Sequence, residues 1–173
     1  MNPDSLVGRR ISARRGEIFK AEYLPQLGPF RDAGALVSAI QARGFDTVAA
    51  SSAKRDELEA LLNIAGALSL LSDSASGDDA EQSKPDPDII HAALKKTHVG
   101  AANALMIGDT PYDIEAAARA GVSTVAFRCG GWNDAALHGA IAIYDGPWEL
   151  LDRLDESPIA NPRSQIPKPK SQR

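Results

Sequence analysis

The chain has 173 residues, which is enough for one domain and hardly enough for two. Hydrophobic residues make up 43% and charged residues 24%, and 19 Lys and Arg against 23 Asp and Glu give a formal net charge of -4. This balance is typical of a globular protein and excludes a broadly basic nucleic-acid-binding protein. The single cysteine, Cys129, excludes an intramolecular disulfide framework and a zinc site made of several cysteines.

The two ends of the chain differ in composition from its middle. Residues 1–24 carry several arginines and few apolar residues, and we expect them to form an arm. Residues 25–155 are expected to form the folded core, and residues 156–173, rich in proline and basic side chains, a disordered tail. The sequence contains neither a run of ~18 apolar residues nor a secretory signal, so we expect a cytoplasmic protein without membrane or nucleic-acid partners.

Helix-like and strand-like segments alternate along the core. Apolar periodicity predicts helices over residues 32–43, 54–65, 86–97 (with Asp86 as the N-cap), 110–121 and 147–154. Short apolar runs predict strands over residues 45–50, 68–71, 104–107, 122–127 and 140–144, with a polar loop over 72–83. Strands that alternate with helices of this length pair in parallel, so the predicted class is α/β with a doubly wound, mostly parallel sheet.

Polar side chains follow three of the predicted strands. Ser51 and Ser52 follow the first, Lys84 follows the loop after the second, and Asp109 and Asp113 follow the third. In parallel sheets ligands bind beyond the carboxyl ends of the strands, so these groups are expected to meet at one rim. A hydroxyl and an ammonium group can hold phosphate oxygens, and a carboxylate pair can hold Mg²⁺. The set therefore predicts a site for phosphoryl transfer.

Each of these residues also has an ordinary structural interpretation. Ser51 or Ser52 would cap the helix that follows, and Lys84 would be a solvated loop lysine. Asp113 would act as the acid of a capping box at the start of its helix. Asp109 ends an apolar strand at the ligand edge of the sheet, where a carboxylate usually has a partner.

Other phosphate and nucleophile chemistries lack their motifs. The sequence has no GxxxxGK[ST], no GxGxxG after a strand and no HExxH. Cys129 follows a predicted strand and precedes two glycines, but no histidine is positioned by the sequence to activate a thiol nucleophile. A tight Gly-Gly turn is the better explanation of this segment.

The order of these motifs resembles that of the haloacid dehalogenase-like (HAD) hydrolases, and within them the phosphoglycolate phosphatase-like group. The resemblance runs from about Leu24 to Leu154. Residues 47–53 look like the family's second motif, residues 84–87 like the third, and residues 106–117 like the fourth, GDxxxD, which is the most specific of the three.

The resemblance implies Mg²⁺-dependent hydrolysis of a small phosphorylated metabolite, with phosphoglycolate as the reference substrate, through an aspartyl-phosphate. By the same resemblance Ser51, together with Ser52, would bind the phosphoryl oxygens. Lys84 would offset the negative charge of nucleophile and phosphate. Asp109 would ligate Mg²⁺, and Asp113 would orient the site or pair with Lys84.

One element of the family pattern is missing. The family's first motif, DxDx[TV] at the end of an apolar strand, is not in the chain, and the only DxD, at residues 86–88, opens a helix. We therefore expect a sheet without its first, central strand and without most of the cap, residues 1–24 being a remnant of the helical cap or a flexible arm. The chain would then be a fragment whose nucleophile lies upstream, and its own enzymatic activity is left open.

Three alternatives remain at this stage. The chain could be a catalytically silent HAD-like binding or regulatory module, or part of a HAD-type sugar phosphomutase, which uses the same motifs. A nucleophile could also come from another chain. The incomplete sheet would favour self-association, because it leaves backbone groups unpaired.

Overall fold

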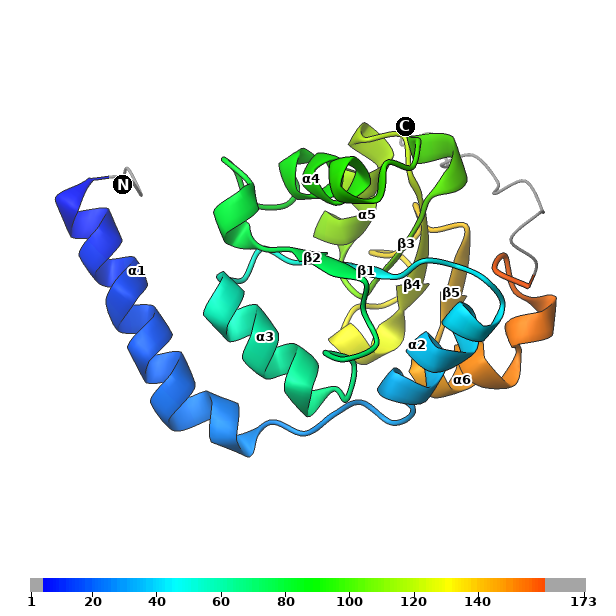
Figure 1. Ribbon diagram of the computed structural model, residues 1–173, viewed down its shortest axis with the longest axis horizontal. Helices are drawn as coiled ribbons and strands as arrows, with labels where there is room; N and C mark the ends of the chain where they lie inside the picture. Colours follow the sequence, from blue (N-terminus) through cyan, green and yellow to red (C-terminus); the bar gives the residue numbers. More distant parts are fainter. Residues whose placement is uncertain (1–4, 161–173) are drawn as a thin grey trace.

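The computed structural model describes residues 5–160, in which helices surround a set of short strands and one long helix, α1, extends to the side (Figure 1). The α-helices are α1 (Leu6–Ile18), α2 (Ala33–Ala42), α3 (Arg55–Ile64), α4 (Asp88–Thr97), α5 (Pro111–Arg119) and α6 (Pro147–Asp152). The strands are β1 (Val48–Ala50), β2 (Asp73–Ala75), β3 (Leu105–Gly108), β4 (Ser123–Phe127) and β5 (Ala142–Tyr144). In these residues no helix combines the length and apolar character needed to cross a bilayer.

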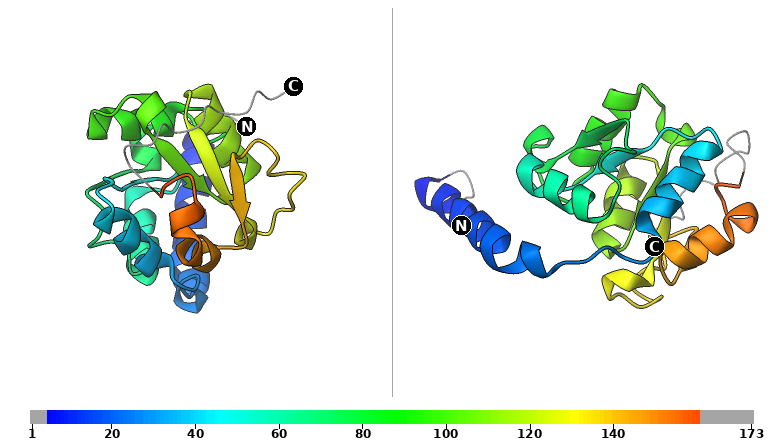
Figure 2. Two further views of the ribbon diagram at one scale, coloured as in Figure 1. Left: turned by 90° about the vertical axis from the view of Figure 1, so that its right-hand side faces the viewer. Right: turned by 60° about the horizontal axis from the view of Figure 1, so that its bottom comes forward.

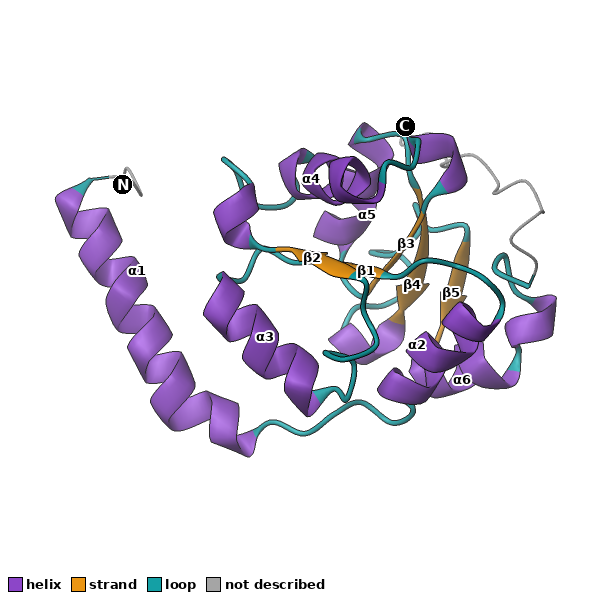
Figure 3. Cartoon of the chain, in the orientation of Figure 1, coloured by secondary structure: helices purple, strands orange, loops and turns teal. Residues whose placement is uncertain are grey.

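The strands form two parallel sheets. One contains β1 and β2, and the other has the order β3-β4-β5 (Figure 3). The registers align Val48 with Asp73 and Val125 with both Ile107 and Ala142. The α/β class with parallel strands is confirmed. Among the described residues no hydrogen-bonded ladder joins β1 to β3, so the sheet is interrupted between the strands that lead to Ser51 and to Asp109.

Helices cover both faces of the strands (Figure 2). On one face α2 and α6 pack on β4 and β5, with Leu36, Ile40, Val125 and Leu150 in the cluster. On the other face α4 packs on β1 and β2, and α5 packs on β3 and β4; their core residues are Ile89, Ile90, Ala116 and Ala117. Because successive strand residues face opposite sides, β4 contributes side chains to both layers, and all five of its residues are buried.

The start and end of α5 follow the sequence signals closely. Thr110 is the N-cap, Pro111 occupies the first turn, and the helix is followed by Gly121 with φ of +75°. Proline suits this position because the first-turn N–H has no intrahelical partner, and glycine suits the left-handed conformation after the last turn. This helix positions the carboxylates of the site.

The predicted strand over residues 68–71 is wrong, and so is the uninterrupted loop over 72–83. Residues 68–70 form a turn after α3, with Leu68 43% exposed, and the strand lies downstream at Asp73–Ala75. In its two-stranded sheet β2 has β1 on one side only, and of its three residues Ala75 alone is buried. An apolar run is not needed in such a position, which is why the hydrophobic pattern missed it.

The third predicted helix begins later than expected. The N-cap of α4 is Pro87 rather than Asp86, and the helix begins at Asp88. The Asp86 carboxylate nevertheless accepts a hydrogen bond from the Asp88 backbone N–H at 3.2 Å, so it bonds a first-turn amide from one residue further away.

The two ends differ in how far they match the expectation. The arm is helical over α1, with Ser5 as its N-cap, and continues through one π-helical turn at Phe19–Tyr23. At the other end Ser157 and Ile159 are buried, and Ile159 belongs to the same cluster as α2 and α6, so the expected disorder does not begin at residue 156. Residues 161–173 lie outside the described part of the chain.

Candidate active site

The turn from β3 into α5 holds the Asp113 carboxylate in a fixed position. Its Oδ2 accepts hydrogen bonds from the Thr110 hydroxyl at 2.8 Å, the Thr110 N–H at 3.0 Å and the Asp109 N–H at 3.2 Å. The Thr110 hydroxyl in turn accepts from the Asp113 N–H, which completes the capping box predicted for this acid. A Cβ at Gly108 would lie 2.6 Å from the Asp113 Cβ, so the close approach requires glycine there.

Lys84 connects this turn to the other sheet. Its Nζ donates to Asp113 Oδ1 at 2.7 Å and to the Ala50 carbonyl oxygen at 2.9 Å. The side chains of Lys84 and Asp113 are only 14% and 8% exposed. The interpretation of Lys84 as a solvated loop residue is therefore wrong: its amine lies between the carboxyl end of β1 and the first turn of α5.

The two carboxylates differ in their electrostatic environment. Burial by itself would raise the pKa of Asp113, but the charge and hydrogen bond of Lys84, together with the Thr110 hydroxyl, hold that pKa below its usual range. Burial raises the pKa of Asp109, and the neighbouring Asp113 charge raises it further. Within residues 5–160 Asp109 forms no ion pair. The Lys84 charge acts against this rise but does not cancel it, so the ionised form of Asp109 is less favoured than that of Asp113.

The serines lie at the end of β1. The Ser51 N–H donates to the Ala75 carbonyl at 2.9 Å, and its hydroxyl accepts from the Ala53 N–H at 3.1 Å. The Ser52 hydroxyl accepts a long, 3.4 Å hydrogen bond from the Lys84 N–H. The N-cap of α3 is Lys54, with no side-chain cap bond, so neither serine caps this helix as the structural interpretation expected.

Several contacts of the site were not anticipated from the sequence. The backbone of Gly130 packs on Asp109: a Cβ there would lie 2.5 Å from the Asp109 carbonyl oxygen and 2.6 Å from its Oδ2. No local signal marks Gly130, because the contact joins two loops. Burial, and then the Asp109 charge, raise the pKa of the neighbouring Cys129 thiol, which disfavours a thiolate nucleophile. This agrees with the turn interpretation of the Cys-Gly-Gly segment.

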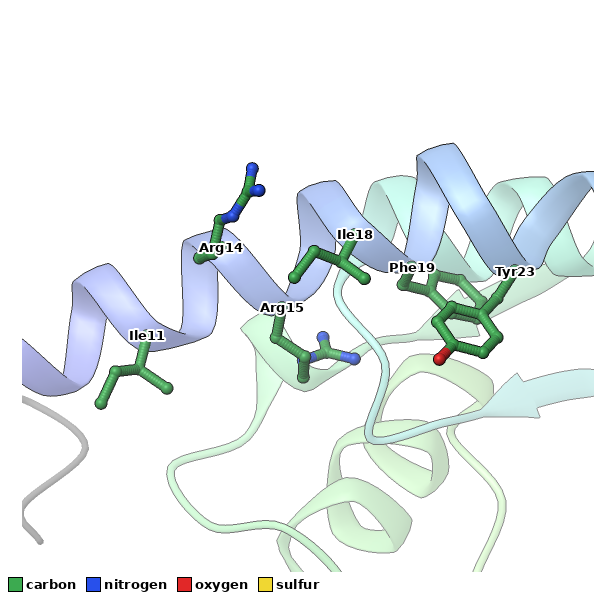
Figure 4. A pocket seen from close by; sticks show the side chains of 6 residues that line it. All are labelled: Ile11, Arg14, Arg15, Ile18, Phe19 and Tyr23. Atoms are coloured by element: carbon green, nitrogen blue, oxygen red, sulfur yellow. The ribbon is translucent and has the colours of Figure 1, made fainter.

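A cavity of about 600 Å³ borders the serine end of the site. It lies between α1, α3 and the segment that leads to Lys84, and its lining includes Arg15, Ser52, Lys54, Glu57 and Ser83. Figure 4 shows a second pocket, on α1 and the turn after it, in which Arg15 lies beside Ile18 and the Phe19 and Tyr23 rings lie further along; Arg15 and Phe19 line both pockets. Arg15 Nη2 lies 2.9 Å from both oxygens of the buried Glu57 carboxylate, so α1 is attached to α3 at this cavity.

The side chains at this rim can supply one carboxylate ligand to a magnesium ion. In the described residues there is no group of three or more His, Cys, Asp or Glu side chains that could hold a metal. Asp113 already bonds Lys84 and Thr110, so Asp109 is the carboxylate left for a cation. Mg²⁺ commonly takes one or two carboxylates and completes its shell with water and phosphate oxygens, which a half-buried Asp109 at a sheet rim can accommodate.

Comparison with known proteins places this arrangement in a family. The model of the haloacid dehalogenase-like hydrolases matches residues 10–127. A phosphoglycolate phosphatase of Rhodospirillum rubrum is 34% identical over 141 residues, which cover 79% of this chain and 58% of that protein. A plasmid-encoded phosphoglycolate phosphatase of Cupriavidus necator is 30% identical over 111 residues, or 63% and 48% of the two chains.

The fold agrees with these matches. The crystal structure of a hydrolase from Pseudomonas syringae superimposes with a TM-score of 0.77 at 28% identity, covering 86% of this chain and 69% of that one. The chain belongs to the haloacid dehalogenase-like hydrolase family. It spans about three fifths of the length of the Rhodospirillum rubrum relative.

Proposed function

We propose that these residues form the phosphate- and metal-binding part of a Mg²⁺-dependent phosphomonoester hydrolase of the phosphoglycolate phosphatase-like group. The observation that carries the proposal is the Lys84 amine, placed 2.7 Å from Asp113 and 2.9 Å from the end of β1, beside a half-buried Asp109. A cation, hydroxyls and a carboxylate at one sheet rim are suited to a phosphate ester. The similarity to two phosphoglycolate phosphatases supports the substrate class.

Each residue has a distinct role in this proposal. Ser51 and Ser52 donate hydrogen bonds to phosphoryl oxygens, and Lys84 offsets the negative charge of phosphate and nucleophile. Asp109 holds Mg²⁺, which when bound neutralises charge on the transferring group. Asp113 positions Lys84 through the capping box, and it does so without contacting substrate.

The nucleophile of the proposed reaction lies outside these 173 residues. In the aspartyl-phosphate mechanism an aspartate carboxylate oxygen attacks phosphorus, the P–O bond to the alcohol breaks, and water then cleaves the acyl phosphate to regenerate the carboxylate. The described carboxylates at the site already have other roles, because Asp113 pairs with Lys84 and Asp109 is the metal ligand. The cavity beside Ser52 is a suitable place for the alcohol part of the substrate.

The test is phosphate release from p-nitrophenyl phosphate and from 2-phosphoglycolate. It compares the 173-residue chain with the product of the longest reading frame that contains it, with Mg²⁺ and with EDTA. We expect Mg²⁺-dependent hydrolysis by the longer product and none by the 173 residues alone. In the longer product, Asp109→Asn should lower kcat by on the order of 10²–10³-fold, as for the loss of one electrostatic contact to the transition state.

The matched control is Asp134→Asn. Asp134 is an exposed acid that pairs with Arg128 at 2.6 Å and has no assigned role in the proposed site, so its loss should leave the rate unchanged. A longer product that folds and hydrolyses neither ester would contradict the proposal and leave the silent-module interpretation. Interconversion of sugar phosphates without net phosphate release would instead identify a phosphomutase.

A further inference from the structure

We propose that the apolar stripe of α1 is an interface for a second copy of this chain, in which the two α1 helices pair in antiparallel orientation. The stripe consists of Val7, Ile11 and Ile18, with Arg14 between the two isoleucines. The inference is independent of the proposed hydrolysis. It is based on how α1 contacts the core, on the spacing of its apolar residues and on the placement of its charges.

The helix α1 leaves its apolar side chains outside the core. Its buried residues are Gly8 and Gly16, and in the described part of the chain none of its side chains belongs to a hydrophobic cluster. Its attachment is polar instead, through Arg15 and the buried Glu57 carboxylate at 2.9 Å. Glycine in a helix interior costs about 1 kcal/mol relative to alanine, and an isolated helix of about 12–15 residues is marginal in water. A 13-residue helix with two internal glycines therefore needs apolar packing that this core does not supply.

The spacing of the apolar residues places them on one face of α1. Val7 and Ile11 are four residues apart, and Ile18 follows Ile11 after seven. Val7 is 56% and Ile11 53% exposed, and Ile18 is half-buried. Ile11, Arg14 and Ile18 also line the pocket along α1 in Figure 4. This spacing is that of the apolar positions of a two-helix coiled coil, in which a second helix covers the stripe.

The charges beside the stripe are complementary in an antiparallel pair. Arg10 and Glu17 are seven residues apart, so they lie on the same side of the stripe. When Val7 lies opposite the partner's Ile18, Arg10 comes next to the partner's Glu17. The two-fold axis repeats this contact, so the pair contains two such ion pairs. A parallel pair would instead place Arg10 next to the partner's Arg15, where the like charges repel.

The size of the interface predicts a weak, reversible dimer. The helix α1 has 13 residues, which makes it about 20 Å long. Two helices of this length bury less than the about 1,200 Å² of surface that a standard specific interface contains. The helix forms one edge of the molecule (Figure 1), so a second copy can approach it from outside the core. We therefore expect association to depend on protein concentration.

The test measures the average mass of the 173-residue chain by sedimentation equilibrium, from micromolar to millimolar protein and with a thiol reductant present. We expect the mass to rise from that of one chain toward that of two. Ile11→Asp places a charge in the stripe and should weaken association by at least about tenfold, which is about 1.4 kcal/mol. Leu68→Asp is the matched control, because Leu68 is a 43% exposed leucine outside α1, and it should associate as the wild type does.

Charge reversal tests the antiparallel register. Arg10→Glu and Glu17→Arg each bring like charges together, and each variant alone should associate about tenfold more weakly than the wild type. An equimolar mixture of the two variants should associate as the wild type does, because both ion pairs re-form between unlike chains. The double variant should do the same within one kind of chain. Circular dichroism checks each fold, and the wild-type mass decides alone if a variant is unfolded.

Four outcomes would overturn the proposal. The first is a chain that stays monomeric at millimolar concentration. The second is association that Ile11→Asp does not weaken, since the interface would then lie elsewhere, for example at the open strand edges. The third is stronger association of Arg10→Glu alone, which indicates a parallel pair. The fourth is a longer reading-frame product that stays monomeric while its α1 amides exchange more slowly than in the 173-residue chain, because a preceding segment then covers the stripe.

Discussion

The two sheets of this protein are built from strands of very different character. In the three-stranded sheet, β4 is a run of five buried residues, and the capping box fixes the turn after β3. In the two-stranded sheet, β2 is Asp73-Ser74-Ala75 with one buried residue. The carboxylates of the site thus lie on the well-packed half and the serines on the weakly packed half, and Lys84 connects the two. This contrast predicts where substitutions will be costly.

The largest effect is expected at the connection itself. Lys84→Met keeps the side-chain volume but leaves the buried Asp113 carboxylate without its cation. Removing one partner of a buried ion pair destabilises a protein by about 3–5 kcal/mol, and we expect a loss of this size here. Urea denaturation at neutral pH measures the free energy of unfolding of the variant and of the wild type. Arg14→Ala is the control, because Arg14 and Glu17 form a pair of similar length that is 71% and 65% exposed, and its loss should cost under about 1 kcal/mol. Equal losses of unfolding free energy in Lys84→Met and Arg14→Ala would refute the greater importance of the buried pair.

The second prediction compares leucines of the two halves. Leu150 is fully buried in the cluster beneath β4 and β5, and Leu150→Ala should lower the unfolding free energy by about 2–5 kcal/mol through lost burial and a residual cavity. Leu68 lies in the turn before β2 and is 43% exposed, so Leu68→Ala should cost well under half as much. Thermal denaturation measures the melting temperatures of both variants and of the wild type. Similar melting temperatures for Leu150→Ala and Leu68→Ala would contradict the prediction.

The third prediction concerns the contact between Gly130 and Asp109. In Gly130→Ala the new Cβ would meet the Asp109 backbone oxygen at 2.5 Å, so the loop or the carboxylate must shift. We expect a loss of about 1–3 kcal/mol in stability, as for other overpacked positions. Gly28→Ala is the control, because its Cβ would have no neighbour within 4 Å. An unaffected Gly130→Ala would show that the two loops are not in contact.

The smallest effect is a pH dependence in the weakly packed half. Hydrogen bonds from the Ser76 backbone and hydroxyl hold the pKa of Asp79 below its usual range, although burial opposes them. A carboxyl whose pKa is lower in the folded than in the unfolded state stabilises the fold at neutral pH, and this contribution is lost as the pH falls below about 4. Asp79→Asn should therefore have a lower free energy of unfolding than the wild type at pH 7, and this difference should be smaller at pH 3. A difference that is the same at both pH values would exclude a contribution of Asp79 ionisation to stability.

Much of the site was accessible from the sequence because its signals are local. The Thr110-Pro111 start, the capping acid Asp113 and the glycine after α5 lie within a dozen residues, and each has one favourable conformation there. The order of Ser51, Lys84 and Asp109 after successive segments predicted that they meet at one rim; the structure places the Lys84 amine against Ala50 and Asp113, and the binding roles of these residues stay a prediction. The strand at 68–71 was misplaced because β2 is short and polar, and such a strand has no hydrophobic period to detect.

The sequence by itself determined the α/β class, the capping box and the residue types that can meet a phosphate ester. These follow from periodicity and from interactions within one turn of a helix. Tertiary structure alone decided that Lys84 lies between Ala50 and Asp113 and that Gly130 packs on Asp109. Such contacts join residues far apart in the chain, and their geometry depends on how the helical layers pack rather than on any local preference.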